Sequence, residues 1–242
     1  KGMAAIRRPN RTPMFGHDLY WIGIFGNPEK DDAWGWQLDG HHLALNITVV
    51  GNEVAVRPAF MGSDPARLPE GVYSGWNVQG AEDEKGKALF ESLATNQRAK
   101  AIIGDTAPRD VITGPTRGDQ LKTPIGLPVS DLDKKQRRLF MSLLSEYVHN
   151  YEHDIAHIQM ERIMKAGLDK IHFAWAGTKD DAPYYYRIHG PTVIIEFDNH
   201  YPPGRSSGPI NHIHTVFREP GNDYGDLLRK HLLESPHHHK SK

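Results

Sequence analysis

The sequence predicts an α+β protein in which an antiparallel β-sheet forms the core and a central helical segment packs on it. Runs of aromatic and β-branched residues, typical of strands, occur near both ends of the 242-residue chain. Between them, apolar residues recur at helical spacing. Because a split would leave the first predicted hairpin with little partner surface, we expect one domain over residues 1–242, with 237–242 as a flexible tail.

The first strand-rich region contains three predicted strands. Residues 19–26 (LYWIGIFG) form the first, and residues 35–50 (GWQLDGHHLALNITVV) form a second, longer one. A third strand, 53–60 (EVAVRPAF), follows Gly51 and Asn52, a dipeptide typical of tight turns. We therefore expect the second and third strands to form a hairpin.

The central part of the chain has the pattern of helices. Residues 82–103 show helical spacing of apolar side chains. Ser130 and Asp133 form a helix-start signal before an apolar stripe that ends at Tyr147, and a further helical stretch runs to Ala166, with Gly167 as a suitable cap. The chain then returns to strands at 170–177, 184–190, 192–198 and 211–218, and closes with a short helix at 223–233.

Composition excludes several classes of protein. The net charge of −1 gives no field that would attract nucleic acid, and no apolar run is long enough to span a membrane. The absence of cysteine excludes disulfides and thiolate chemistry. The chain begins without methionine and without the apolar region of a signal peptide, so we expect an N-terminal portion to be missing. An extracellular or periplasmic location is favoured, and the oligomeric state stays open.

Two histidines in the last predicted strand suggest a metal site. His212 and His214 are one residue apart, and alternate residues of a strand point to the same face. His42, on the predicted strand 35–50, is a third imidazole that could join them. A carboxylate commonly completes such a site, and Glu196 or Glu219 could act as fourth ligand or general base.

Two short motifs near these histidines are similar to cupin motifs. The spacing from His212 through His214 to Glu219 resembles the first cupin motif, and His42 with Asn46 resembles part of the second. Their order along the chain is reversed, and the long helical segment is not typical of cupins. The motifs therefore support a metal site without predicting the cupin fold.

A competing set of histidines lies in the helical region. His149, His153, His157 and Glu161 follow one another at intervals of four, so they would form one stripe on a continuous helix. The H-E-x-x-H order of zinc proteases is missing. This pattern favours a solvated helix face.

Aromatic residues suggest an alternative function that needs no metal. They could wall a pocket for a carbohydrate or peptide, in which case the protein would be a binding module and the histidines would only form hydrogen bonds. Arg187 would then serve as an anion anchor. A metal-free glycosidase that uses Glu196 is a third possibility. The aromatic residues concerned are Trp34, Trp36, Trp175 and Tyr184 to Tyr186.

Four ordered segments resemble the domain-of-unknown-function 3500 family. They are residues 34–66, 166–177, 184–199 and 211–228, and the similarity extends from Leu19 to Leu232. Members are longer at the N-terminus, which agrees with a missing N-terminal portion. The resemblance implies no activity, but it places distinctive polar residues at Gly40, His41 and His42, at Glu196, Asp198 and Asn199, and at Asn211, His212 and His214.

The leading hypothesis is an enzyme with one mononuclear transition-metal site, holding Zn, Mn, Fe or Cu. His42, His212 and His214 would bind the ion, with Glu219 or Glu196 beside them. Asn199 and Asn211 would orient the ligands, and His41 would transfer protons. The reaction would be hydrolytic or oxidative, and the substrate a small organic molecule, a carbohydrate or a peptide. His41, Glu196 and Arg187 are thus the predicted catalytic residues.

Overall fold

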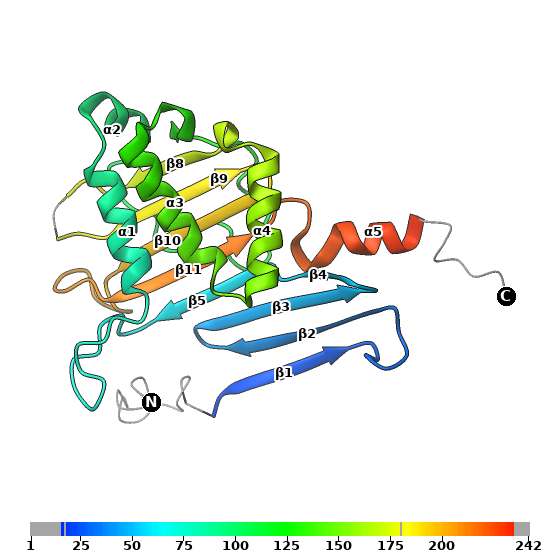
Figure 1. The fold of residues 1–242 in the computed structure, drawn as a ribbon. Helices are drawn as coiled ribbons and strands as arrows, with labels where there is room; N and C mark the ends of the chain where they lie inside the picture. Colours follow the sequence, from blue (N-terminus) through cyan, green and yellow to red (C-terminus); the bar gives the residue numbers. More distant parts are fainter. Residues whose placement is uncertain (1–15, 17, 180, 235–242) are drawn as a thin grey trace.

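A β-sheet of 11 strands runs through the part of the chain that the structure describes, namely residues 16, 18–179 and 181–234 (Figure 1). The structure is a computed structural model. The strand order is β1-β2-β3-β5-β11-β10-β9-β8-β6, with β4 paired to β3 and β7 to β8. The strands are β1 (Tyr20–Phe25), β2 (Ala33–Gly40), β3 (Leu43–Val50), β4 (Glu53–Ala55), β5 (Ala59–Ser63), β6 (Ile102–Gly104), β7 (Leu127–Pro128), β8 (His172–Ala176), β9 (Tyr184–Gly190), β10 (Val193–His200) and β11 (His212–Arg218).

The strand-rich regions from the two ends of the chain join in the middle of this sheet. β5 pairs antiparallel with β11, and this pairing places Gly62 opposite His214. β6 and β8 pair in parallel, while the other strand pairs of the sheet are antiparallel. The prediction of an α+β fold with an antiparallel sheet is confirmed.

Helices cover one face of the second half of the sheet. Figure 1 shows α1, α3 and α4 in front of β8 to β11. α3 begins after Asp133, whose side chain accepts a hydrogen bond from the backbone of Gln136, and α4 ends at Gly167 with a φ of 104°. Among the described residues, no helix has the length and apolar character needed to cross a membrane. The helices are α1 (Gly80–Glu91), α2 (Thr95–Ala101), α3 (Lys134–Val148), α4 (His153–Ala166) and α5 (Asp226–Glu234).

Stacked aromatic rings form the core between the helices and the sheet. Phe90 of α1 stacks on Trp175 at 4.2 Å between ring centroids, and Trp175 stacks on Tyr184 at 5.4 Å. Tyr186 stacks on Phe197 at 4.8 Å. Such pairs contribute about 0.5–1.5 kcal/mol each beyond the burial of their area. Because Trp175, Tyr184 and Tyr186 are buried here, they are not available to the aromatic binding face that we considered as an alternative.

The sheet has two chemically different faces because its strands alternate. In β10, Val193, Ile195 and Phe197 belong to the apolar core. The alternate residues Glu196 and Asp198 point to the opposite face and are also fully buried. Strand register places Asp198 beside His214 and beside Tyr185, so polar residues of several strands meet on this second face.

Three elements differ from the sequence-based expectation. The predicted strand 53–60 is interrupted at residues 56–58 and forms β4 and β5, and the predicted helix 82–103 consists of α1, α2 and the short strand β6. The predicted strand 35–50 is a hairpin, because Gly40 pairs with Leu43 and the chain turns at His41 and His42. The helical stretches predicted between Asp133 and Ala166 are α3 and α4, which are separated at residues 149–152. His149 therefore caps α3, whereas His157 lies on α4 and pairs with Glu161 in an exposed position, as expected for a solvated helix face. The predicted tail 237–242 lies outside the described residues.

Candidate metal centre

Three histidine side chains converge where the β2–β3 turn meets β11. The distance between Nε2 of His42 and Nε2 of His212 is 3.1 Å, and that between Nε2 of His42 and Nε2 of His214 is 3.3 Å. His212 and His214 point to the same face of β11, as their spacing predicted. The same polar face receives His42 from the adjoining turn, although this residue is 170 positions away from His212 in the chain.

The spacing of these nitrogens fits the ligand shell of a metal ion. Metal–nitrogen bonds of 2.0–2.1 Å place two ligand nitrogens about 2.9 Å apart at a right angle and about 3.4 Å apart at a tetrahedral angle. The observed separations of 3.1 and 3.3 Å lie between these limits. The three residues thus form a group that could hold a metal ion.

Gly62 on β5 leaves the space that two of the rings occupy. A Cβ atom at this position would lie 2.7 Å from Cδ2 of His42 and 2.9 Å from Cδ2 of His214. It would also lie 2.9 Å from the backbone oxygen of Ile213, which cannot move without disturbing β11. A residue without a side chain is therefore required between the two imidazoles.

The environment keeps two of the three imidazoles neutral. Burial, together with the neighbouring histidines, lowers the pKa of His42 to about 3. Burial and the proximity of His214 and His200 lower the pKa of His212 to about 3 as well. Because a metal competes with protons for the imidazole nitrogen, rings that stay neutral at pH 7 are ready to bind one.

His214 differs from the other two because a carboxylate holds its second nitrogen. Nδ1 of His214 lies 3.0 Å from Oδ1 of Asp110, and this contact fixes the ring orientation. Although burial acts to lower the pKa of His214, the hydrogen bond to Asp110 and the charges of Asp198 and Asp110 raise it. With a proton on Nδ1, Nε2 keeps its lone pair toward His42, as in the carboxylate–histidine–metal arrangement of many metalloproteins.

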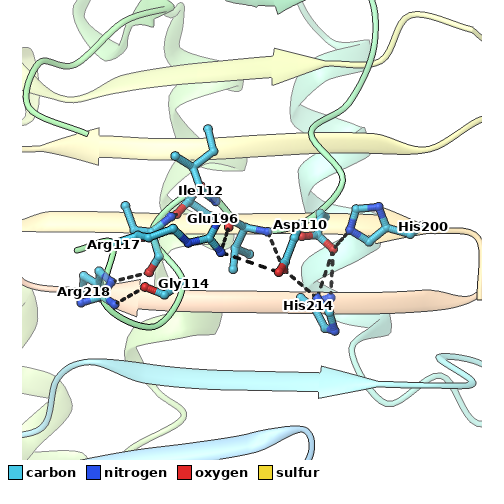
Figure 2. A network of polar contacts seen from close by, with 11 residues as sticks. Asp110, Ile112, Gly114, Arg117, Glu196, His200, His214 and Arg218 are labelled. Atoms are coloured by element: carbon cyan, nitrogen blue, oxygen red, sulfur yellow. Dashed lines mark hydrogen bonds and ion pairs between the residues drawn. The ribbon is translucent and has the colours of Figure 1, made fainter. Parts of the chain in front are cut away.

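Asp110 belongs to the segment 105–126, which crosses the polar face of the sheet. Figure 2 shows part of this segment, with Asp110, Ile112 and Gly114, above the strands that carry Glu196 and His214. The side chain of Arg218 donates hydrogen bonds to the backbone oxygens of Thr113 and Gly114. The segment therefore closes over the polar face and carries Asp110 to the histidines.

Glu196 anchors this segment. Its carboxylate accepts hydrogen bonds from the backbone of Ile112 at 2.8 Å and from the backbone and hydroxyl of Thr113 at 2.8 and 2.5 Å. The hydroxyl of Tyr185 donates a further bond of 2.6 Å. Both oxygens are thus engaged away from the three histidines, and Glu196 does not belong to their group.

The structure does not bring the other predicted carboxylate to the histidines either. Glu219 follows the end of β11, where it lies 3.7 Å from Arg162 and accepts a hydrogen bond from Asn222. Asn199 donates to the hydroxyl of Tyr184, and Asn211 bonds the backbone of Arg67. Strand alternation explains the positions of the two asparagines. Asn199 is next to Asp198 and Asn211 is next to His212, so each points away from the face that carries the histidines.

The predicted catalytic residues His41 and Arg187 have contrasting positions. His41 is exposed in the β2–β3 turn, and its ring centroid lies 4.3 Å from that of His42. Arg187 is only 1% exposed and lies opposite Glu196 in the strand register. The structure thus brings His41 to the metal group and places Arg187 inside the protein.

Sequence reasoning missed two residues beside the histidines. Asp110 lies in an irregular segment that carries no periodic signal. His200 extends β10 by two residues beyond the predicted end, and Nε2 of His200 lies 2.5 Å from Oδ1 of Asp198. The alternation of Glu196, Asp198 and His200 along one strand could have revealed His200.

Comparison with known proteins identifies a family but no activity. The fold and site define an α+β protein with a histidine cluster on the polar face of its sheet. The family described as "Protein of unknown function (DUF3500)" matches residues 2–226, so the chain belongs to this family and the expected relationship is confirmed. No curated protein and no solved structure matches the chain.

Proposed function

We propose that this protein is a metal-dependent hydrolase with one ion bound by His42, His212 and His214. The observation that supports this proposal is the convergence of three imidazole nitrogens at separations of 3.1 and 3.3 Å. Three nitrogen ligands leave at least one coordination position open for water or substrate. The substrate is a small organic molecule, a carbohydrate or a peptide.

The type of ligand favours hydrolysis over oxidation. Three neutral imidazoles leave the positive charge of a Zn²⁺ ion uncompensated, which lowers the pKa of a bound water and supplies a nucleophile at neutral pH. Oxygen-activating iron sites instead commonly combine two histidines with one carboxylate. In this protein, Asp110 bonds Nδ1 of His214 rather than entering the group of three histidines.

Two further residues have roles in this proposal. Asp110 holds the imidazole of His214, so that its Nε2 stays directed at the ion. His41 is exposed beside His42 and can pass protons between the site and solvent. Asp110 is therefore a positioning residue, and His41 is the candidate for proton transfer.

The metal-free binding module has less support. Most of its aromatic face is buried, and of the predicted residues Trp34 and Trp36 are partly exposed. The buried residues are Trp175, Tyr184, Tyr185 and Tyr186. An oxidative enzyme remains the second candidate, because the same three imidazoles also suit Cu and Fe. The identity of the bound metal distinguishes it from the hydrolase.

Measurement of the metal content tests the proposal. We expect about one equivalent of zinc on the three-histidine site of purified, untagged protein, and its loss in His42→Ala and in His212→Ala. His157→Ala, which removes an exposed histidine on α4, is the matched control. Because His237, His238 and His239 could also take up metal, all variants should carry alanine at these positions.

Each outcome of the metal measurement bears on the proposal. A zinc content in both site variants equal to that of the wild type would contradict the proposed ligands. Protein that neither contains nor takes up Zn, Mn, Fe or Cu would exclude a metal enzyme. Copper or iron in place of zinc would favour the oxidative candidate, and an oxidase screen would replace the hydrolase screen.

A further inference from the structure

A second group of potential ligands adjoins the three histidines. Asp198 and His200 are on β10 and point to the same face as His214, since strand register pairs Asp198 with His214 and His200 with His212. One ligand atom each from Asp198, His200 and His214 lies within 4.8 Å of the others. Figure 2 shows His200 and His214 at the same end of the polar network as Asp110.

The contact between Asp198 and His200 is close, but it lacks the geometry of a regular hydrogen bond. Nε2 of His200 lies 2.5 Å from Oδ1 of Asp198. The same nitrogen has no partner with regular hydrogen-bond geometry among the described residues, although its proximity favours the charged form of Asp198. A ring nitrogen and a carboxylate oxygen that are adjacent without facing each other can both point at a third atom between them.

The burial of Asp198 calls for a cation. Its side chain is 0% exposed, and its Oδ2 has no hydrogen-bond partner within the described part of the chain. Burial raises the pKa of Asp198, against the opposing effect of His200 and His214. A buried carboxylate without full compensation is costly, and coordination of a metal is one of the ways in which proteins compensate it.

His214 connects this group to the three histidines. Its Nε2 faces His42, whereas its Nδ1 lies 3.9 Å from Oδ1 of Asp198 and 3.0 Å from Oδ1 of Asp110. Two ligands at a right angle around a metal would be about 2.9 Å apart, so Asp110 and Nδ1 of His214 already have a suitable separation. The 2.5 Å contact of Asp198 with His200 would have to open by a few tenths of an ångström.

We propose that Asp198, His200 and Nδ1 of His214 form a second metal position, with Asp110 at its exposed side. The two positions share the ring of His214, so the protein binds a pair of ions. Loading the second position removes the proton from Nδ1 of His214 and releases it to solvent. This inference goes beyond the proposed function, which needs only the first ion. It rests on the proposed function only in that both ions would use the ring of His214.

Zinc titration of metal-free protein by equilibrium dialysis tests this inference. We expect the wild type to bind two equivalents per chain and His200→Gln to bind one. The substitution should weaken binding of the second equivalent more than about 100-fold relative to the wild type. His42→Ala should remove the first equivalent and retain the second. His214→Ala should weaken both, because both positions use this ring.

The controls separate loss of a ligand from loss of the fold. His189→Gln alters another buried histidine on the same face of the sheet and should leave both equivalents in place. Asp198→Asn is a second test, and urea unfolding of each metal-free variant shows whether it is folded. All proteins should carry alanine at positions 237–239.

The results distinguish this inference from the proposed function. One equivalent in the wild type that is unchanged in His200→Gln would overturn the second position and leave the proposed function intact. One equivalent that persists in His42→Ala and disappears in His200→Gln would support the Asp198–His200 position and overturn the proposed function. No uptake of zinc would overturn both.

Discussion

At the scale of single residues, the candidate centre depends on a missing side chain as much as on its ligands. Gly62 sits between the rings of His42 and His214, and a Cβ atom there would lie within 3 Å of both. Neighbouring strands otherwise carry side chains on this face, so the glycine opens the space that two imidazoles occupy. The site is therefore sensitive to a change that removes no potential ligand.

Gly62→Ala should weaken metal binding while every ligand stays in place. The added methyl group collides with both rings and with the backbone oxygen of Ile213, so the imidazoles must separate. We expect the free energy of unfolding of the metal-free protein to fall by about 1–3 kcal/mol. Zinc affinity should fall at least about tenfold, as for the loss of other supporting contacts.

The matched control for this substitution is Gly104→Ala on β6. A Cβ atom there would meet its nearest neighbour at 3.5 Å, which is ordinary van der Waals contact. Zinc affinity should stay at the wild-type value, as measured by competition with a chromophoric chelator. Equal zinc affinity in Gly62→Ala and the wild type would show that the spacing of the rings does not govern binding.

At the scale of elements, the segment 105–126 links the candidate centre to the sheet. Glu196 holds this segment through the backbone of Ile112 and the backbone and hydroxyl of Thr113. The same segment brings Asp110 to His214. A residue predicted to be catalytic thus positions a second residue that touches the metal group.

Glu196→Gln should loosen this segment. The carboxamide replaces one accepting oxygen by a donor group, which opposes the N–H and O–H donors of Ile112, Thr113 and Tyr185. We expect the free energy of unfolding to fall by about 3 kcal/mol and zinc affinity to fall with it, because Asp110 loses its position.

Urea unfolding and zinc competition measure these two effects. Glu161→Gln, an exposed substitution on α4, should change neither quantity by more than about 0.5 kcal/mol. Weaker zinc binding in Glu196→Gln without any loss of stability would instead indicate that Glu196 acts on the ion directly. That result would restore its predicted role as a base or ligand.

Most elements were predictable because their signals are local. Strand β9 has the predicted bounds of 184–190, and the cap Gly167 ends α4 as expected. The turn at His41 and His42 was missed because these two residues are not a typical turn dipeptide, while the Asp39–Gly40 pair before them lies within β2. The position of the break before α4 has no local signal, because the histidine spacing continues across it.

Part of the three-histidine group was predictable from strand alternation rather than from turn and cap signals. The spacing of His212 and His214 places both on one face of any strand. That His42 joins them requires the pairing of β5 with β11, which no local pattern specifies. Asp110 is 104 positions from His214 and lies in an irregular segment, so only the folded structure reveals it.

At the scale of the whole molecule, one sheet separates two kinds of interior. The helix-covered side contains stacked aromatic rings, whereas the other side buries Arg187, His189 and Glu196 under or beside the segment 105–126. Burial of titratable groups on this scale makes the stability of the fold depend on pH. His189 is suited to measuring this effect because it lies outside both candidate metal groups.

His189→Gln should reduce the acid sensitivity of the fold. Burial, with Arg187 and His172 nearby, lowers the pKa of His189 to about 4, while the unfolded chain keeps a value near 6.5. Between pH 6.5 and pH 4, His189 is protonated in the unfolded state but stays neutral in the folded state. The wild type therefore loses stability as the pH falls toward 4. This residue contributes about 3 kcal/mol to the loss.

In urea unfolding with a chelator present, the variant should lose correspondingly less stability between pH 7 and pH 4, whereas His157→Gln, an exposed substitution on α4, should follow the wild type. Parallel curves for His189→Gln and the wild type would mean that His189 takes up its proton in the folded protein, and that the polar face admits water.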